Sequence, residues 1–454
     1  MFNRVLNKYK SLSLNSKTVV LNVFGAFVVK GAALLLSVFI LPAYLRFFDD
    51  RSVLGLWFTI VSILSWFLNF DLGIGNGLRN QLVKALTQNN KDDVKKYITS
   101  AYVSTGIVTL VFGVIFWFIL DYIDWNWLLN IRENSIPHAT LLLSIKITVL
   151  GIIAQFFFRL ISFILYAIQY SFINNLLVLI SSLGMFLYVI LAIPGTDAQN
   201  MLSLAIVNAV TANVPLIVVT ILIFSSKLRY AIPRPRFYSN RYAKSVLGLG
   251  LVFFLIQVAY MILVNTNEFL ITFFTGSNNV VDYQIYQKLF TLIGVFFSLV
   301  LTPISSIVIK ALEEKKHHWV NKLYQKLFRM ACMACVTQFT MVFFLQPLLN
   351  LWLQEKTILV NYWYAICFAM MGSLMIFNGV LSSIANGLGK LQPQLYFFGL
   401  GAILKLSLAW GLVTSFASWI GIILTNIIVL GTYCFVQTLI LNRYFRKMIE
   451  VTDS

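Results

Sequence analysis

Six ionisable residues lie inside stretches that are otherwise apolar, and their charges are the first chemistry that the sequence offers. Five are cations and one is an acid, namely Lys30, Lys146, Arg159, Lys288, Lys405 and Glu268. An ionisable side chain in the middle of a bilayer costs about 2.5–3.5 kcal/mol on insertion scales, so it usually faces protein or a water-filled cavity. Five cations against one acid leave net positive charge in the interior, and such a cavity attracts anions.

Three of the cations are the strongest candidates for binding an anion. Lys30 and Lys405 lie near the middle of their apolar stretches, and Arg159 shares a helical face with Gln155 and Ser162. That polar face cannot point at lipid without cost, so we expect a cationic cavity at these positions.

Two further cations and the acid leave alternatives open. Lys146 and Lys288 lie closer to the outer ends of their stretches, where a long side chain either lines the cavity or snorkels to the interface. Glu268 and Lys288 fall at a similar depth, roughly 9 Å below the outer ends at 1.5 Å per residue. They form either a structural ion pair or, at Glu268, a binding site for a coupling proton or Na⁺.

No catalytic residue, metal site or cofactor is predicted. Cys332 and Cys335 form a C-x-x-C inside an apolar run, but a zinc site needs about four ligands and no second Cys/His pair has a matching position. His317 and His318 lie in a basic amphipathic loop, where a solvated face is the default interpretation.

The elements that position these residues are membrane-spanning helices. Of the 454 residues, 59% are hydrophobic and only 11% charged, against roughly a quarter charged in soluble proteins. Twelve apolar runs, each near the 20 residues that a span needs, predict an all-α polytopic integral membrane protein. The runs are about 18–45, 53–70, 97–120, 139–168, 172–194, 201–226, 245–274, 283–309, 323–346, 360–385, 395–413 and 419–441.

The net charge of +18 follows the positive-inside pattern and does not form one patch for nucleic acid. With a cytoplasmic N-terminus, most Lys and Arg fall in cytoplasmic segments. The outer loops hold only Arg46, Arg51, Arg132 and Lys356. Both termini are therefore predicted to be cytoplasmic.

An internal repeat divides the chain into two halves. The pattern K-A-L-x7-V-x-K occurs at 84–96 and again at 310–322, each time in the basic loop after the second span of its half. We expect two pseudo-symmetric six-helix lobes, 1–226 and 245–454 including the C-terminal tail. Their axis of pseudo-symmetry lies along the membrane normal, and the basic cytoplasmic linker 227–244 joins them.

The glycine-rich segment 71–80 (D-L-G-I-G-N-G-L-R-N) does not predict a nucleotide site, because no strand precedes it and no G-K-[ST] follows. Its glycines instead favour tight helix packing. With the preceding Phe70 it resembles a motif of bacterial polysaccharide repeat-unit flippases, which belong to the multidrug/oligosaccharidyl-lipid/polysaccharide exporter superfamily. L-P-A-Y-L (41–45), G-L-W (55–57) and T-N-E-F-L-I (266–271) are also similar to that family. The last of these often carries Asp where this chain has Glu268.

The resemblance implies a flippase of a bacterial inner membrane, in the assembly of O-antigen, lipopolysaccharide or related polysaccharides. It implies a polyprenyl-pyrophosphate-linked oligosaccharide as substrate, moved from the cytoplasmic to the periplasmic leaflet by alternating access, with other polysaccharide-assembly membrane proteins as partners. Lys30, Arg159 and Lys405 would hold the pyrophosphate, with Asp71 and Arg79 at the cytoplasmic entrance. The alternatives are a cation-coupled drug exporter and, less favoured, a membrane-embedded glycosyltransferase or polymerase, since the outer loop 121–138 has few acids or arginines.

The topology is open to a direct test by reporter fusion. Fusions after Ser225 and Leu441 should report cytoplasm, and fusions near Asn130 and Ala198 should report periplasm, because the basic segments fix the orientation. A periplasmic C-terminus would contradict both the twelve spans and the two matched halves.

Overall fold

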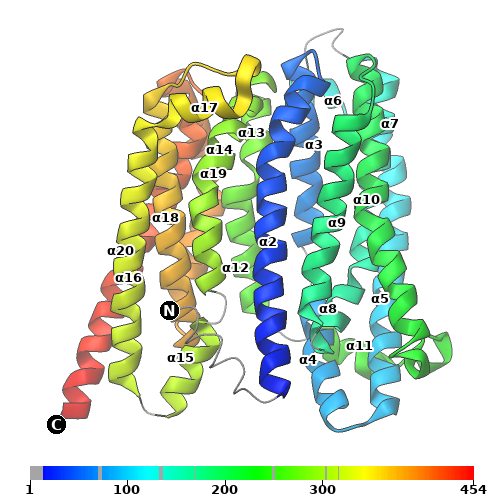
Figure 1. The fold of residues 1–454 in the computed structure, drawn as a ribbon, viewed down its shortest axis with the longest axis vertical. Helices are drawn as coiled ribbons and strands as arrows, with labels where there is room; N and C mark the ends of the chain where they lie inside the picture. Colours follow the sequence, from blue (N-terminus) through cyan, green and yellow to red (C-terminus); the bar gives the residue numbers. More distant parts are fainter. Residues whose placement is uncertain are drawn as a thin grey trace. The chain divides into compact units, whose positions relative to one another are not determined.

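A computed structural model describes residues 14–69, 74–131, 136–168, 170–247, 251–301, 304–314 and 316–453 (Figure 1). Within those ranges the chain forms helices joined by turns and short loops, which confirms the predicted all-α fold. Most connections between consecutive helices are short turns, so most of the described residues are helical.

Within the described residues, each predicted apolar run overlaps one, two or three consecutive helices. The main helices are α2 Leu14–Phe47, α3 Arg51–Asn69, α4 Ile74–Thr87, α5 Lys91–Ile119, α7 His138–Phe158, α8 Leu160–Ala167, α9 Ser171–Leu191, α10 Asp197–Ser225, α11 Asn240–Leu247, α12 Leu251–Asn265, α13 Asn267–Thr275, α14 Asn278–Leu301, α15 Ile304–Glu313, α16 His317–Phe343, α17 Leu345–Leu353, α18 Tyr362–Gly387, α19 Gln392–Phe416 and α20 Ile420–Asp453. A short helix, α6 Trp125–Leu128, and four 3₁₀ turns complete the described elements.

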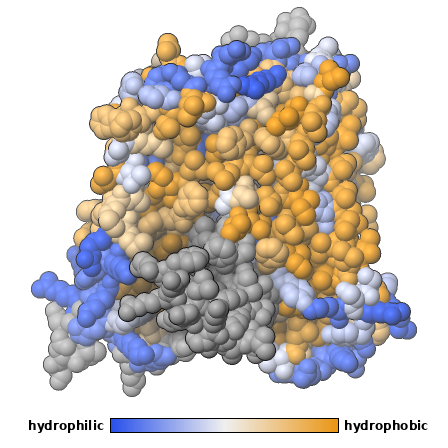
Figure 2. Space-filling view, viewed as in Figure 1, coloured by the Kyte–Doolittle hydropathy of each residue, from blue (hydrophilic) through white to orange (hydrophobic). Residues whose placement is uncertain are grey.

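Many of these helices have the length and composition of membrane spans. Among the described residues eight are long and apolar enough, and the bent pair α12–α13 gives a ninth. Gly31–Phe47 and Arg51–Ile63 are shorter apolar segments. Figure 2 shows apolar side chains over the middle of the helices and hydrophilic ones near their ends. The chain is thus a multi-pass membrane protein.

The contacts divide the chain into two compact units. Unit 1 comprises Met1–Ala43, Phe70–Tyr122 and His138–Gly250, and unit 2 comprises Tyr44–Asn69, Ile123–Pro137 and Leu251–Ser454. These units differ from the expected lobes in one respect that matters below. Helix α3, which the sequence places in the N-terminal lobe, packs with α12, α13 and α14 in unit 2.

The core of unit 1 is formed by α4, α5, α8 and α10 around buried residues such as Leu82, Ile98 and Ile164. The glycine-rich segment contributes a close helix contact, as its sequence predicts. A Cβ on Gly77 would lie 1.9 Å from the carbonyl oxygen of Val246, so only glycine fits there.

The basic linker 227–244 is docked onto the start of α5 in unit 1. Three of its aromatic rings each lie near a lysine ammonium of α5, at 5.6–5.7 Å from ring centroid to nitrogen, in the pairs Tyr230–Lys91, Phe237–Lys95 and Tyr242–Lys96. The Tyr242 hydroxyl also donates a hydrogen bond of 2.6 Å to Asp93. That bond raises the pKa of Tyr242, because it stabilises the protonated phenol. The linker is therefore held as part of unit 1.

The core of unit 2 is formed mainly by α12, α15, α16, α18, α19 and α20. The two copies of the repeat have the same local structure at corresponding places. Ala85 lies in the last turn of α4 and Ala311 in the last turn of α15, and the carbonyl of each accepts an N–H five residues later, from Asn90 and Lys316. The valines that follow, Val94 in α5 and Val320 in α16, are both buried. A helix end, a turn and a buried anchor are thus repeated.

Candidate functional site

Unit 2 contains a broken span at the position of the predicted acid. Helix α12 ends at Asn265 and α13 begins at Asn267, and the two meet with a bend of 40°. Neither proline nor glycine lies at this junction, so the break is not explained by the usual helix breakers. Its explanation lies in the side chains that bind the freed backbone.

Side chains replace the backbone hydrogen bonds that the break removes. The Thr266 hydroxyl donates to the Ile262 carbonyl at 2.5 Å, and the Lys405 ammonium donates to the Leu263 carbonyl. The Asn265 carbonyl accepts from the Trp66 indole N–H at 2.8 Å and from the Ser62 hydroxyl at 3.1 Å. Backbone carbonyls without partners are costly in an apolar interior, so these donors stabilise the bend.

Lys405 is a fully buried cation, with only 2% of its surface exposed. Its ammonium donates to Leu263 O, to Asn267 Oδ1 at 2.8 Å and to Asn426 Oδ1 at 3.1 Å. An ammonium has three protons to donate, and these three oxygens accept all of them. In this conformation the side chain that the sequence assigned to substrate is bound by the protein itself.

Glu268 lies one residue after Asn267, in the first turn of α13. Its two carboxylate oxygens accept hydrogen bonds of 3.0 Å, one from the Ser62 hydroxyl and one from the Gln284 amide. Lys288 and Lys405 attract it electrostatically. Among the described residues, the ion pairs do not include a direct Glu268–Lys288 contact. The acid is thus bound by neutral donors, and the cations act on it from farther away.

The two charges lie at the helix ends that favour them. Lys405 binds a carbonyl in the last turn of α12, where the helix dipole is negative, and Glu268 lies in the first turn of α13, where it is positive. Each arrangement contributes typically 0.3–1 kcal/mol, and more when partly buried. Broken membrane helices place cations and anions at such ends in transporters generally.

One face of α3 meets this region through small and polar residues. At intervals of three or four residues, as one helical face requires, Arg51, Gly55, Thr59, Ser62 and Trp66 all contact α12, α13, α14 or the turns between them. We call these five residues the α3 polar row. The Thr59 and Thr272 hydroxyl oxygens are 2.6 Å apart, and a Cβ on Gly55 would lie 1.9 Å from the Ser277 carbonyl oxygen.

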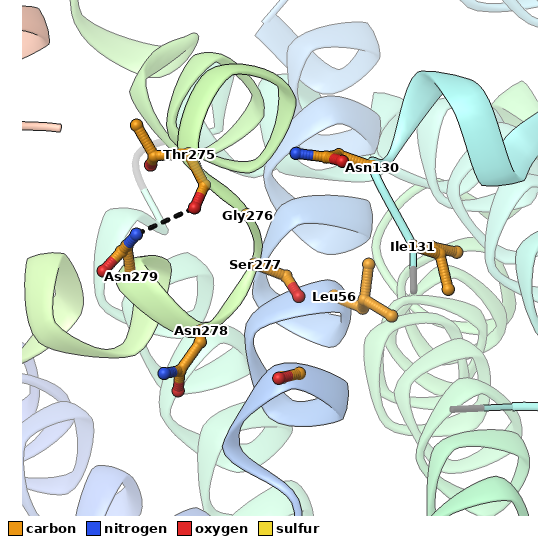
Figure 3. A pocket seen from close by; sticks show the side chains of 9 residues that line it. Leu56, Asn130, Ile131, Thr275, Gly276, Ser277, Asn278 and Asn279 are labelled. Carbon is orange, nitrogen blue, oxygen red and sulfur yellow. Dashed lines mark hydrogen bonds between the residues drawn. The ribbon is translucent and has the colours of Figure 1, made fainter. Parts of the chain in front are cut away.

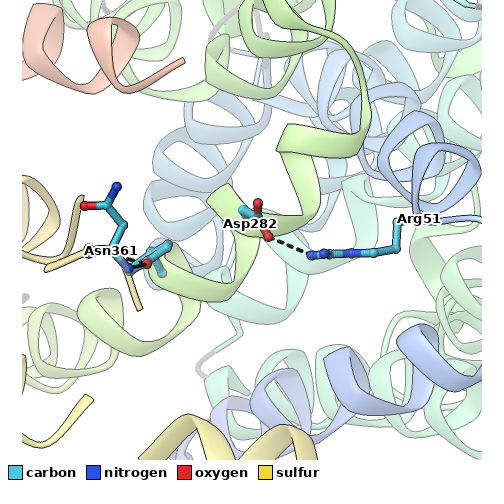
Figure 4. Close-up of polar contacts among 4 residues, drawn as sticks. Arg51, Asp282 and Asn361 are labelled. Atoms are coloured by element: carbon cyan, nitrogen blue, oxygen red, sulfur yellow. Dashed lines mark hydrogen bonds and ion pairs between the residues drawn. The ribbon is translucent and has the colours of Figure 1, made fainter. Parts of the chain in front are cut away.

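The outer end of the row carries an ion pair and a small pocket. Arg51 Nη2 lies 2.6 Å from Asp282 Oδ1 (Figure 4). Beside it, Leu56, Asn130 and the turn 275–279 line a pocket of about 130 Å³ (Figure 3). Typical ligand pockets hold about 300–1,000 Å³. This pocket is therefore too small for an oligosaccharide.

Two of the predicted cavity cations in unit 1 have side chains that the structure describes. Lys146 in α7 pairs with Asp121 at 2.6 Å and lies 4.6 Å from the centre of the Trp117 ring. Its charge is thus compensated locally. Arg159 lies at the one-residue interruption between α7 and α8 and is half-buried.

Four predicted residues remain, and the structure describes the side chains of two of them. Lys30 belongs to α2, and its side chain lies outside the described part of the structure, as does Asp71 altogether. Arg79 is exposed on α4. Lys288 is half-buried in α14, and its ammonium makes no hydrogen bond or ion pair with any described residue. Lys405, Glu268 and Lys288 all belong to unit 2, where Glu268 interacts electrostatically with both lysines.

Sequence reasoning missed the neutral partners of these charges. Asn267, Asn426, Ser62 and Gln284 bind Lys405 or Glu268, yet none of them was assigned a role from the sequence. The sequence carried one weak signal for these partners, namely amide side chains inside apolar runs. Such side chains are costly to bury unless they are hydrogen-bonded. Asn426 in particular stands in a run of aliphatic residues at 420–430.

The surroundings of Glu268 predict the outcome of a charge swap. Glu268→Lys should destabilise the protein by about 1–3 kcal/mol, since Ser62 and Gln284 lose their acceptor and the new cation faces a helix N-terminus. Adding Lys288→Glu should not restore stability, whereas Glu268→Gln should stay close to the wild type. Thermal unfolding of the purified full-length protein measures all three. Recovery in the double variant would show that the two residues pair directly.

Comparison with known proteins supports the fold. No family model matches the chain, and no curated protein matches its sequence. An inward-facing multidrug resistance MATE family transporter of the MOP superfamily is similar in structure, with a TM-score of 0.72 and 13% identity over 94% of this chain and 99% of that one. An outward-facing one gives 0.62 and 14% over 96% of both chains. A MOP superfamily transporter from Pyrococcus furiosus, described as having a binding pocket of reverse polarity, gives 0.58 and 14% over 93% and 95%. These neighbours are transporters and not enzymes, and the chain has the fold of MATE family transporters of the MOP superfamily.

Proposed function

We propose that this protein is an alternating-access flippase that moves a polyprenyl-pyrophosphate-linked oligosaccharide across the bacterial inner membrane, from the cytoplasmic to the periplasmic leaflet. The observation that carries the proposal is the excess of cations over acids in the apolar helices, five against Glu268. Cations held at membrane depth are costly, and a pyrophosphate between them relieves that cost.

We propose Arg159 as the main contact for such a substrate. Lys30 and Lys288 remain candidate cationic contacts, whereas Lys146 and Lys405 have protein partners in this structure. A guanidinium binds phosphate oxygens through two parallel hydrogen bonds, which makes Arg159 the main candidate. Asp71 and Arg79 keep their proposed place at the cytoplasmic entrance.

The α3 polar row supports the alternating-access part of the proposal. Hydroxyls, a tryptophan N–H and an arginine join α3 to α12–α14 by bonds that water can replace when the helices separate. A purely apolar contact would lose about 25 cal/mol for each Å² exposed to water. We therefore propose that α3 leaves α12–α14 when the cavity opens to the outer side.

A cation-coupled drug exporter fits the same fold equally well, since structurally similar proteins are described as multidrug transporters. Glu268 is the residue that favours it, because an acid next to a helix break can bind a coupling cation. The cation excess argues for an anionic substrate instead. The two functions differ in what accumulates when the protein is lost.

Deletion of the coding sequence separates the candidates. We expect lipid-linked repeat units to accumulate on the cytoplasmic leaflet, measured by accessibility to an impermeant enzyme in oriented vesicles. Unchanged intermediates with increased drug sensitivity would support the exporter instead. Loss of the intermediates themselves would support a glycosyltransferase or polymerase.

Substitutions at Arg159 should rank by charge and shape. Arg159→Lys keeps the charge but loses the bidentate fork, so it should impair transport less than Arg159→Ala, and Arg159→Glu should abolish it. Complementation of the deletion strain gives the ranking, with membrane levels of each variant as the control. Normal complementation by Arg159→Glu would remove this residue from the binding site.

A reversible cross-link tests whether α3 must move. In a background without the four native cysteines, Thr59→Cys with Thr272→Cys places two thiols where the hydroxyl oxygens are 2.6 Å apart, close to the S–S length of about 2.0 Å. Oxidation should stop transport, and reduction should restore it.

A matched pair in unit 1 controls for the chemistry. Gly184→Cys with Thr211→Cys joins α9 to α10, where a Cβ on Gly184 lies 3.6 Å from the Thr211 Cβ, within the range of natural disulfides. Oxidation of this pair should leave transport intact. Full transport with the Thr59–Thr272 pair cross-linked would contradict the opening of α3.

A further inference from the structure

Three neutral oxygen atoms of unit 2 surround one buried positive charge. They are the Leu263 carbonyl oxygen, Asn267 Oδ1 and Asn426 Oδ1, which we call the oxygen cage, and all three accept from Lys405 Nζ. Carbonyl and amide oxygens at an unwound helix segment are the ligands with which membrane proteins bind Na⁺ and K⁺. The cage thus has the composition of a monovalent-cation site.

We propose that the oxygen cage is a monovalent-cation site whose resident cation is the tethered ammonium of Lys405, and that it binds free methylammonium or K⁺ when that ammonium is removed. The inference concerns unit 2 alone and does not depend on which substrate the protein carries.

The amide oxygens of the cage are held in place by their own nitrogens. The Asn267 side-chain nitrogen donates to the Tyr283 hydroxyl at 3.2 Å, and the Asn426 nitrogen donates to Asn267 Oδ1 at 3.0 Å. Both amides are therefore oriented with their oxygens toward the cation. Asn267 and Asn426 are completely buried, so water does not compete for these bonds. A cage with fixed oxygens does not need the lysine chain to keep its shape.

The charge of the site also suits a cation. Leu263 lies in the last turn of α12, where the helix dipole is negative, and Glu268 adds electrostatic attraction from the next helix. A tethered ammonium cannot exchange with the solution. The wild-type protein therefore carries its own tethered ammonium at a position where a site without the lysine would need a cation from solution.

Removal of the tether gives the test. Lys405→Ala leaves a space where the side chain was and removes one donor from each of the three cage oxygens. In choline chloride its melting temperature should be several degrees below that of the wild type. Methylammonium chloride or KCl at the same ionic strength should raise it again, with saturation as the concentration increases. The wild type should unfold at the same temperature in all three salts.

Two further variants separate binding in the cage from a general salt effect. Lys405→Met fills the space with an apolar chain of similar length, so it should show no cation response. Lys405→Ala with Asn426→Ala removes one cage oxygen and should weaken the apparent cation affinity at least tenfold.

The proposal has two ways to fail, and neither depends on transport. A folded Lys405→Ala protein with the same melting temperature in choline, methylammonium and K⁺ would overturn it, leaving Lys405 as a structural hydrogen-bond donor. A Lys405→Ala protein that cannot be recovered in any of these cations would overturn it as well, because a cage that fits an ammonium should accept a free one. The flippase proposal stands or falls on the lipid-linked intermediates and is unaffected by either result.

Discussion

The junction between α12 and α13 depends on one constraint, which is that backbone carbonyls freed inside a membrane protein must find donors without water. The carbonyls of Ile262, Leu263 and Asn265 are satisfied by side chains of the junction residue Thr266, of Lys405 in α19 and of Trp66 in α3. Each lost bond would cost several kcal/mol in hydrocarbon. The positions of Lys405 and Trp66 follow from this requirement, and so does the packing of α3 against unit 2.

The same requirement links structure to motion. Trp66 and Ser62 belong to α3, so any separation of α3 from α13 exposes the Asn265 carbonyl. That carbonyl then needs water or a new donor. Ser62 has a single hydroxyl proton but two acceptors within 3.1 Å, the Asn265 carbonyl and the Glu268 carboxylate. The state of Glu268 therefore bears on how firmly Ser62 of α3 is held at this junction.

The fold could be predicted from sequence because each span is a local property. Twenty apolar residues form a helix in a bilayer whatever their neighbours, and each expected run overlaps helices wherever the structure describes it. The partners of the site residues could not be predicted in the same way. Glu268 and Lys405 were found because charges stand out in apolar runs, but Lys405 meets Leu263 across 142 residues of chain. Local pattern carries no information on such pairs. The break at Thr266 has no proline or glycine to mark it, and the packing of α3 with unit 2 depends on contacts that periodicity cannot reveal.

A cation inside a membrane span can be bound by neutral oxygen atoms as well as by an acid. Five cations against one acid describe a positive interior only if all five face the cavity. Lys146 is neutralised by Asp121, and Lys405 is bound by a carbonyl and two amides that carry no formal charge. Dipoles can thus bind a buried ammonium directly, with the acid acting only from a distance, provided that each dipole is fixed in direction. Asn267 and Asn426 meet that condition through their own donated bonds. A count of cations in the sequence therefore overstates the positive charge that a cavity can present to a phosphate.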